Sequence, residues 1–327
     1  MRFARFFQLL LLLTVSLVVV PAQALQVTVT IPPLAGMIAP LLDEDDKIEV
    51  LLKPGVSPHG FQLKPSHLRI LSQSDLLITV GSPVDAWVNK YAQRVEANKI
   101  RLADLAAIEK LPVRKGGLWE RKPGKAVMDD DHDDHDDHDP HEHHGHDELS
   151  YDGHIWMSMN NARLSVRAVS DWLQKQQPQK AAVYRQREAD WLAKLDQQDR
   201  INRQRLQTVQ NNAFFVLHDA FQYFENHYQL KGVGSVRLNP EIPPSLKRLS
   251  ELREKIQKNQ VKCVFQEPQF PSKQMQRLTE GTDTKIGSLD PMGTSYLLAE
   301  KGSQKNYLLY DRFSAYLTDS FMQCLAD

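Results

Sequence analysis

Strand-like and helix-like segments alternate along most of this chain, and this alternation constrains its fold more than any other feature. A first series begins with the β-branched run at 25–31, continues with a helical pattern at 33–42, and ends near residue 105. A second series starts at 213–218 and continues to the C-terminus. Strands that alternate with helices predict βαβ units and parallel sheets. We therefore expect an α/β protein with two (βα)-type lobes.

A long helical segment separates the two series. Residues 178–209 begin with a proline, contain no glycine and are rich in Ala, Gln, Arg and Leu. A helix of about 30 residues spans roughly 45 Å, which is long for one small domain and suits a rod between two. We expect an N-terminal lobe over 25–172, a linking helix region over 173–209 and a C-terminal lobe over 210–327.

The first residues have the pattern of a secretory signal peptide. Arg2 and Arg5 precede an apolar run at 6–20, and the small-residue pattern Ala22-Gln23-Ala24 follows. This arrangement predicts a signal peptide over 1–24 that is cleaved after Ala24, so the mature protein is exported. An uncleaved anchor helix is the alternative interpretation.

Export gives the two cysteines of the chain a meaning. In an oxidising compartment Cys263 and Cys324 tend to form a disulfide. The loop that this bond closes has about 60 residues, for which chain entropy gives a stabilisation of up to roughly 4 kcal/mol. Two separate buried thiols are the alternative.

Residues 106–150 lack the alternation and contain an acidic, histidine-rich run at 129–148. Such a composition cannot bury enough apolar surface to offset the cost of ordering, so we expect a disordered loop. Several histidines recur at every third residue and would line one edge of an extended polyproline-II chain. We interpret the run as an accessory metal loop, with a solvated spacer as the alternative. Its histidines are His132, His135, His138, His141, His143, His144 and His146.

The charge of the chain is unevenly distributed. The run at 129–148 holds 11 of the 41 acidic residues and no lysine or arginine, which leaves 40 basic against 30 acidic residues elsewhere. The basic residues are scattered without interleaved aromatic residues, so we expect no nucleic-acid partner.

Five of the twelve histidines lie outside the run, and three of them occupy similar settings. His59 follows a predicted strand, His218 ends another, and His154 lies where the loop returns to a helix. Ligands of open α/β sheets bind outside the carboxyl ends of the strands, and three imidazoles gathered there would hold Zn²⁺. Taken singly, each is equally compatible with a structural or surface role. His67 and His227 lack such a setting, and we interpret them as surface residues.

Six motifs, in this order, resemble those of the zinc-type substrate-binding proteins of bacterial ABC metal transporters, above all the periplasmic component of the high-affinity zinc uptake system. The resemblance runs from residue 26 to the C-terminus, apart from the loop. It implies two lobes joined by one long helix, with the metal in the cleft between them. The motifs are SPHGFQLKPSHLRIL, DGHIWMSMNNARL, FVLHDAFQYFENHYQL, LNPEIPPSLKRLSEL, CVFQEPQF and LDPMGTSY.

The resemblance maps the family's histidine ligands onto His59, His154 and His218. Relatives selective for manganese tend to carry a carboxylate at the third position, where this chain has histidine, and imidazole nitrogen suits Zn²⁺ better than Mn²⁺. The fourth position stays open, because some relatives have a carboxylate where this chain has Pro58. Asp290 matches a metal-site aspartate of other relatives and would ligate the ion, bond a ligand histidine or face a bound water.

Glu267 is a second candidate near the fourth position, with a structural role in a tight turn as the alternative. The resemblance implies a monomeric periplasmic protein that binds Zn²⁺ as transported ligand and delivers it to a membrane permease, with the run as zinc collector or sensor. We expect no enzyme activity, since neither an HExxH motif nor a phosphate-binding loop is present. The alternatives are a receptor for another divalent metal such as manganese, and a zinc hydrolase, because three histidines and an open position also describe catalytic zinc.

Overall fold

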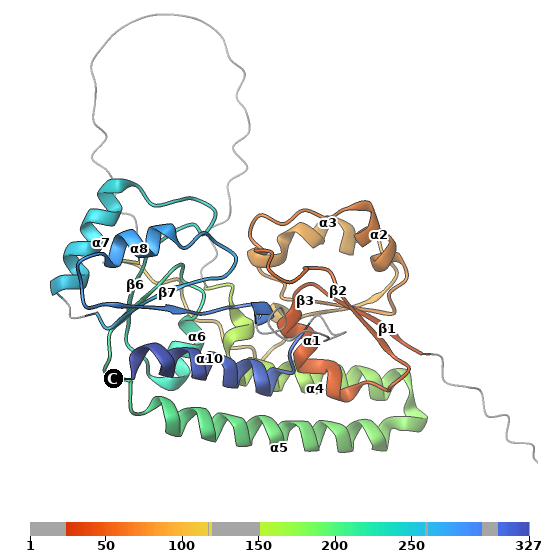
Figure 1. The fold of residues 1–327 in the computed structure, drawn as a ribbon. Coiled ribbons are helices and arrows are strands. Elements are labelled where there is room, and N and C mark those ends of the chain that lie inside the picture. The colour runs from red at the N-terminus through yellow and green to blue at the C-terminus, as the bar shows by residue number, and fades with distance from the viewer. Residues whose placement is uncertain (1–23, 117, 120–150, 259–260, 296–306, 327) are drawn as a thin grey trace, which may run out of the picture.

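The computed structural model describes residues 24–116, 118–119, 151–258, 261–295 and 307–326 (Figure 1). Residues 1–23 of the predicted signal peptide and all seven histidines of the acidic run lie outside these ranges, so the structure does not test those two predictions. Within these ranges no helix is long and apolar enough to span a membrane.

The N-terminal lobe contains a four-stranded parallel sheet with strand order β2-β1-β3-β4. Helices cover both of its faces, as Figure 1 shows. Successive side chains of β3 alternate between these layers: Leu76 and Ile78 join the large core beneath the sheet, and Leu77 joins the smaller cluster above it. The elements are β1 Gln26–Val29, α1 Pro32–Ile38, β2 Lys47–Val50, α2 Pro65–Ser72, β3 Leu76–Thr79, α3 Asn89–Ala92 and β4 Asn98–Arg101.

The C-terminal lobe repeats this topology, although the sequence shows no internal repeat. Its four parallel strands have the order β6-β5-β7-β8. Helices α7 and α8 cover one face and α6 lies on the other (Figure 1). The elements are β5 Phe214–Val216, α6 Gln222–Tyr228, β6 Gly232–Ser235, α7 Leu246–Lys258, β7 Cys263–Gln266, α8 Lys273–Thr279 and β8 Lys285–Ser288. The predicted α/β fold with two parallel sheets is confirmed.

Three helices connect the lobes. The long helix expected from the sequence is α5, Ala181–Leu206, preceded by the 3-10 turn Pro178–Lys180. Helices α4, Met159–Gln176, and α10, Tyr310–Leu325, lie along it beneath the two sheets (Figure 1). The connection is therefore a layer of packed helices, and one hydrophobic core runs through it from lobe to lobe.

The structure contains the predicted disulfide. Cys263 of β7 and Cys324 of α10 are bonded, and both are buried. The bond ties the last turn of the chain to the middle of the C-terminal sheet.

Residues 106–116, 118 and 119 of the predicted loop lie within the described ranges, and the rest of it up to residue 150 lies outside them. Pro112 forms an antiparallel bridge with Tyr151, and the carbonyl oxygen of Leu118 accepts hydrogen bonds from Ser235 and Arg248 of the C-terminal lobe. For these described residues the expectation of disorder is wrong, because composition does not reveal partners that are distant in the sequence, such as Ser235 and Arg248. Between β3 and β4 the chain forms the 3-10 helix Pro83–Val88, followed by the four residues of α3.

Candidate metal centre

Three histidines from distant parts of the chain meet between the lobes. His59 lies in the loop after β2, His154 directly precedes the 3-10 helix Ile155–Met157, and His218 follows β5. Their ring centroids are 5.1 to 5.5 Å apart, and one ligand nitrogen of each lies within 4.8 Å of the others. In the described part of the chain, no other group of His, Cys, Asp and Glu residues is gathered in this way. The structure thus brings together the three histidines that the sequence singled out.

Asp152 fixes the orientation of His154. Its Oδ1 lies 2.7 Å from His154 Nδ1 and also accepts a hydrogen bond from the backbone N–H of His154 at 3.0 Å. A carboxylate accepts but does not donate, so we assign the imidazole proton to Nδ1. The lone pair is then on Nε2, which is buried and has no hydrogen-bond partner among the described residues.

Glu267 has the same relation to His218. Its Oε1 lies 2.5 Å from His218 Nδ1, and His218 Nε2 is likewise buried without a partner in the described ranges. Burial alone would lower the pKa of His218, but the Glu267 carboxylate outweighs this effect and raises it. A carboxylate behind an imidazole orients the ring and increases the basicity of its free nitrogen, as in many zinc sites.

His59, from the loop after β2 of the N-terminal lobe, completes the group. Burial, followed by the proximity of His218 and His154, lowers the pKa of His59 well below its ordinary value. The ring is therefore neutral at physiological pH, which is the form that binds a metal ion.

A small cavity lies against the three rings. Its volume is about 10 Å³, roughly that of one water-sized sphere. Gln269, Phe270 and Met292 contribute to its wall, together with Ser57, Pro58, Glu267 and Pro291. The cavity has room for one water-sized species and no room for an organic substrate.

Asp290 lies outside the three-histidine group. The side chain is wholly buried, and both of its oxygens already accept hydrogen bonds. Oδ1 accepts from Gln269 Nε2 at 2.7 Å and Met292 N at 2.9 Å, and Oδ2 accepts from Ser295 N at 2.7 Å. Among the described residues no hydrogen bond joins Asp290 to a ligand histidine, and direct ligation by Asp290 stays a prediction. Asp290 holds the turn at 291–295 and the amide of Gln269.

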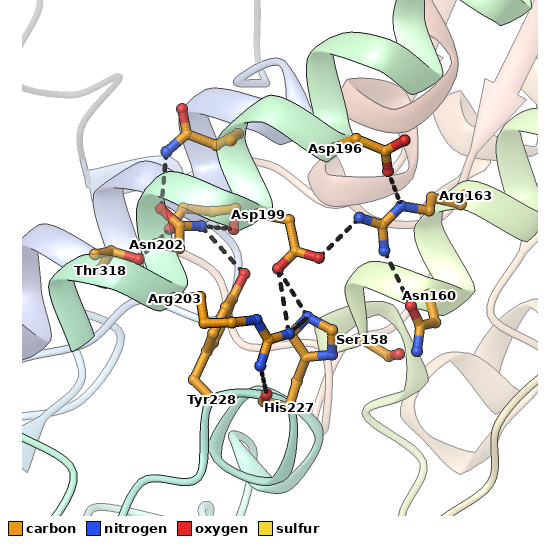
Figure 2. A network of polar contacts seen from close by, with 12 residues as sticks. Ser158, Asn160, Arg163, Asp196, Asp199, Asn202, Arg203, His227, Tyr228 and Thr318 are labelled. Atoms are coloured by element: carbon orange, nitrogen blue, oxygen red, sulfur yellow. Dashed lines mark hydrogen bonds and ion pairs between the residues drawn. The ribbon is translucent and has the colours of Figure 1, made fainter. Parts of the chain in front are cut away.

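The interpretation of His67 and His227 as surface residues is wrong. His67 is only 6 % exposed, and its Nδ1 accepts the backbone N–H of Lys64 at the start of α2. His227 lies in a polar network between α5 and α6, where its Nε2 is 2.8 Å from Asp199 Oδ1 (Figure 2). Asp199 also accepts from Arg163 of α4 at 2.8 Å. His67 pairs with a backbone N–H group, and His227 pairs with a side chain of a helix that is distant in the sequence. The residues next to each histidine in the sequence do not reveal these partners.

Reasoning from sequence also missed two residues near the site, Asp152 and Gln269. The spacing Asp-x-His at 152–154 is a usable signal, because a carboxylate two residues before a ligand can turn back onto its ring. No comparable signal marks Gln269.

Comparison with known proteins gives agreement over nearly the whole chain. The family described as zinc-uptake complex component A, periplasmic, matches residues 27–309. The high-affinity zinc uptake system protein ZnuA of Yersinia pestis is 33 % identical over 300 residues, which are 91 % of each chain. A crystal structure of ZnuA superimposes with a TM-score of 0.72 at 18 % identity, over 93 % of this chain and 100 % of the other. The periplasmic zinc binding protein TroA from Treponema pallidum also gives 0.72, at 20 % identity and the same coverage.

Proposed function

The chain belongs to the family of periplasmic zinc-uptake components, and we propose that it captures Zn²⁺ with His59, His154 and His218. The observation that carries this proposal is the pair of buried, unpartnered Nε2 atoms on His154 and His218, each opposite an Nδ1 held by a carboxylate. Members of this family are solute-binding proteins of ABC transporters and not enzymes. The protein accordingly serves zinc import, and Zn²⁺ is its cargo.

The geometry needs little adjustment to hold the ion. Three nitrogens bound to Zn²⁺ at about 2.0–2.1 Å in a tetrahedron lie about 3.4 Å apart. The ligand atoms here lie within 4.8 Å of one another, so each pair closes by no more than about 1.4 Å on binding. The helical layer of α4, α5 and α10 resists bending of the lobes, and we assign this closing movement to the loops that bear the ligands.

The donor set supports zinc over manganese. Three neutral imidazoles suit Zn²⁺, whereas Mn²⁺ prefers carboxylate, carbonyl and water oxygens. Neither Asp290 nor Glu267 belongs to the three-histidine group, which supports a first coordination sphere without a carboxylate.

The remaining elements of the proposal concern the protein's surroundings. The mature chain begins after cleavage at Ala24, is a monomer in the periplasm and passes its ion to the ABC permease of its own uptake system. The lobes comprise residues 25–172 and 210–327, with residues 173–209 as the linking region. The histidines of the acidic run collect zinc or sense it; the composition of the run predicts no packing that would fix their geometry, so we expect them to bind zinc more weakly than the three-histidine site.

Calorimetry on a variant lacking residues 129–147 tests this proposal. We expect one tight zinc site to remain in the deletion variant, and to disappear when His59, His154 and His218 are also replaced by alanine. Tight binding that survives the triple replacement would refute the assignment. Tighter binding of Mn²⁺ than of Zn²⁺ by the deletion variant would refute the choice of metal.

A further inference from the structure

We infer that Gln269 is a further residue of the metal site, and that its amide oxygen accepts a hydrogen bond from a water molecule bound to the zinc ion. This inference rests on the proposed function, because it concerns the fourth position of the same site. Gln269 follows β7 and lines the small cavity together with His59, His154 and His218.

Asp290 determines which end of the Gln269 amide faces the cavity. Gln269 Nε2 lies 2.7 Å from Asp290 Oδ1, and backbone N–H groups of Met292 and Ser295 also point at this carboxylate. A carboxylate among donors can only accept, so the NH₂ group and not the oxygen of the amide must face it. The orientation of Gln269 therefore follows from its chemical partner.

The other end of the amide is left without a partner. Gln269 Oε1 is buried and has no hydrogen bond to any residue that the structure describes. A buried acceptor left unsatisfied destabilises the folded protein. Two more unpartnered acceptors, the Nε2 atoms of His154 and His218, belong to the walls of the same cavity.

A zinc-bound water satisfies all three atoms at once. The nitrogen lone pairs bind the cation, and the water, as fourth ligand, donates a hydrogen bond to the amide oxygen. Direct ligation by Oε1 fits less well, because zinc in proteins takes sulfur, imidazole or carboxylate donors. The cavity, at about 10 Å³, matches one water-sized sphere.

This arrangement assigns a role to the aspartate that does not ligate. Asp290 orients Gln269, and Gln269 orients the water, so every ligand of the ion is neutral. Without a carboxylate in contact, the site holds Zn²⁺ by nitrogen donors and geometry, which favours release to a transporter.

Zinc competition against a chelator in the full-length protein tests the inference, with the tight site followed by the fluorescence of Trp156, whose ring lies 5.1 Å from that of His154. We expect Gln269→Leu to weaken zinc binding about tenfold, the lower end of the effect of removing an outer-shell partner. We also expect the visible spectrum of the Co²⁺-loaded protein to shift. Gln222→Leu is the matched control. Gln222 lies on α6 outside the cavity, and its amide oxygen is also buried without a hydrogen-bond partner among the described residues. The zinc affinity of this variant should equal that of the wild type.

A second variant distinguishes an effect on the orientation of the Gln269 amide from a general effect on folding. Asp290→Asn allows the amide of Gln269 to turn, so it should weaken zinc binding, and adding Gln269→Leu to it should cause no further loss. Additive losses, or wild-type affinity together with an unshifted Co²⁺ spectrum in Gln269→Leu, would overturn the inference. His59→Ala is measured alongside. If it abolishes tight binding while Gln269→Leu has no effect, only this inference fails; if neither variant affects binding, the proposed function fails as well.

Discussion

Arg114 should contribute strongly to stability, although the composition of its segment indicates disorder. Its Nη1 lies 2.6 Å from Glu225 Oε2 and its Nε lies 2.9 Å from Asp219 Oδ2, while the guanidinium stacks 3.5 Å from the ring of Trp119. Arg114→Met removes the charge and keeps the apolar stem. The substitution leaves Glu225, whose side chain is 4 % exposed, and Asp219, which is 26 % exposed, without their cation.

The two carboxylates contribute unequally to the expected loss. Removing one partner of a buried ion pair costs about 3–5 kcal/mol, and an exposed pair is worth at most about 1 kcal/mol. Asp219 can regain water, so Glu225 dominates, and we expect the free energy of unfolding to fall by about 3 kcal/mol at pH 8. Burial raises the pKa of Glu225 even with Arg114 present, and loss of the cation raises it further.

The pH dependence follows from that direction. A carboxyl group whose folded pKa exceeds its unfolded value, about 4.3 for glutamate, binds its proton better in the folded state. Its contribution is present below the unfolded pKa and is lost as the pH rises through the folded pKa. The destabilisation caused by Arg114→Met should therefore be smaller at pH 5 than at pH 8.

Urea unfolding of the wild type and the variant at both pH values measures the effect. The double variant Arg114→Met/Glu225→Gln should recover most of the loss, since no buried charge remains. Lys258→Met is the matched control: it removes the cation that pairs with fully exposed Glu254 and should have no measurable effect. A loss below about 1 kcal/mol at pH 8, an equal loss at pH 5, or a double variant no more stable than Arg114→Met would refute the reasoning.

Three further predictions concern the site, the disulfide and the helical layer. Glu267→Gln removes the charge behind one ligand imidazole and should weaken zinc binding about 10–100-fold in a chelator competition; unchanged affinity would contradict the role given to this carboxylate. Replacing Cys263 and Cys324 by alanine releases a loop with a sequence separation of 61 and should lower the free energy of unfolding by up to about 4 kcal/mol; identical urea midpoints would argue against it. Burial alone would raise the pKa of Asp199, but its partners in Figure 2 hold it well below the usual range. Its contribution is therefore present above about pH 4 and is lost as the pH falls through the lowered pKa; Asp199→Asn should flatten the acid side of the stability profile, and parallel profiles would contradict this.

Much of the fold could be predicted because its elements obey local rules. The alternation of strand-like and helix-like segments predicted both parallel sheets. The absence of glycine from residues 178–209 predicted α5. The positions of α4 and α10 along α5 could not be predicted, because an apolar helical face shows that something covers it and not what does. Arg114 was missed for a related reason, since its two carboxylates lie more than a hundred residues further along the chain.

Part of the metal site could likewise be predicted from the sequence, and part could not. His59 and His218 could be assigned to one site because both follow strands, and ligands of open α/β sheets bind outside the carboxyl ends of the strands; they belong to the two different sheets, whose carboxyl ends face the same space. Asp290 could not be assigned, because its role depends on how the turn at 291–295 presents backbone N–H groups to it. The part played by Glu267 likewise depends on a contact with His218 across two strands.

Helix α10 has a consequence for the integrity of the core that the two lobes share. It follows all the other described elements in the sequence, yet it packs against α1 and against α5, and Phe321 lies among the aromatic rings of the C-terminal lobe. Without this helix, the shared core has an open side. Removal of the whole of α10 would therefore uncover apolar surface in both halves of the protein.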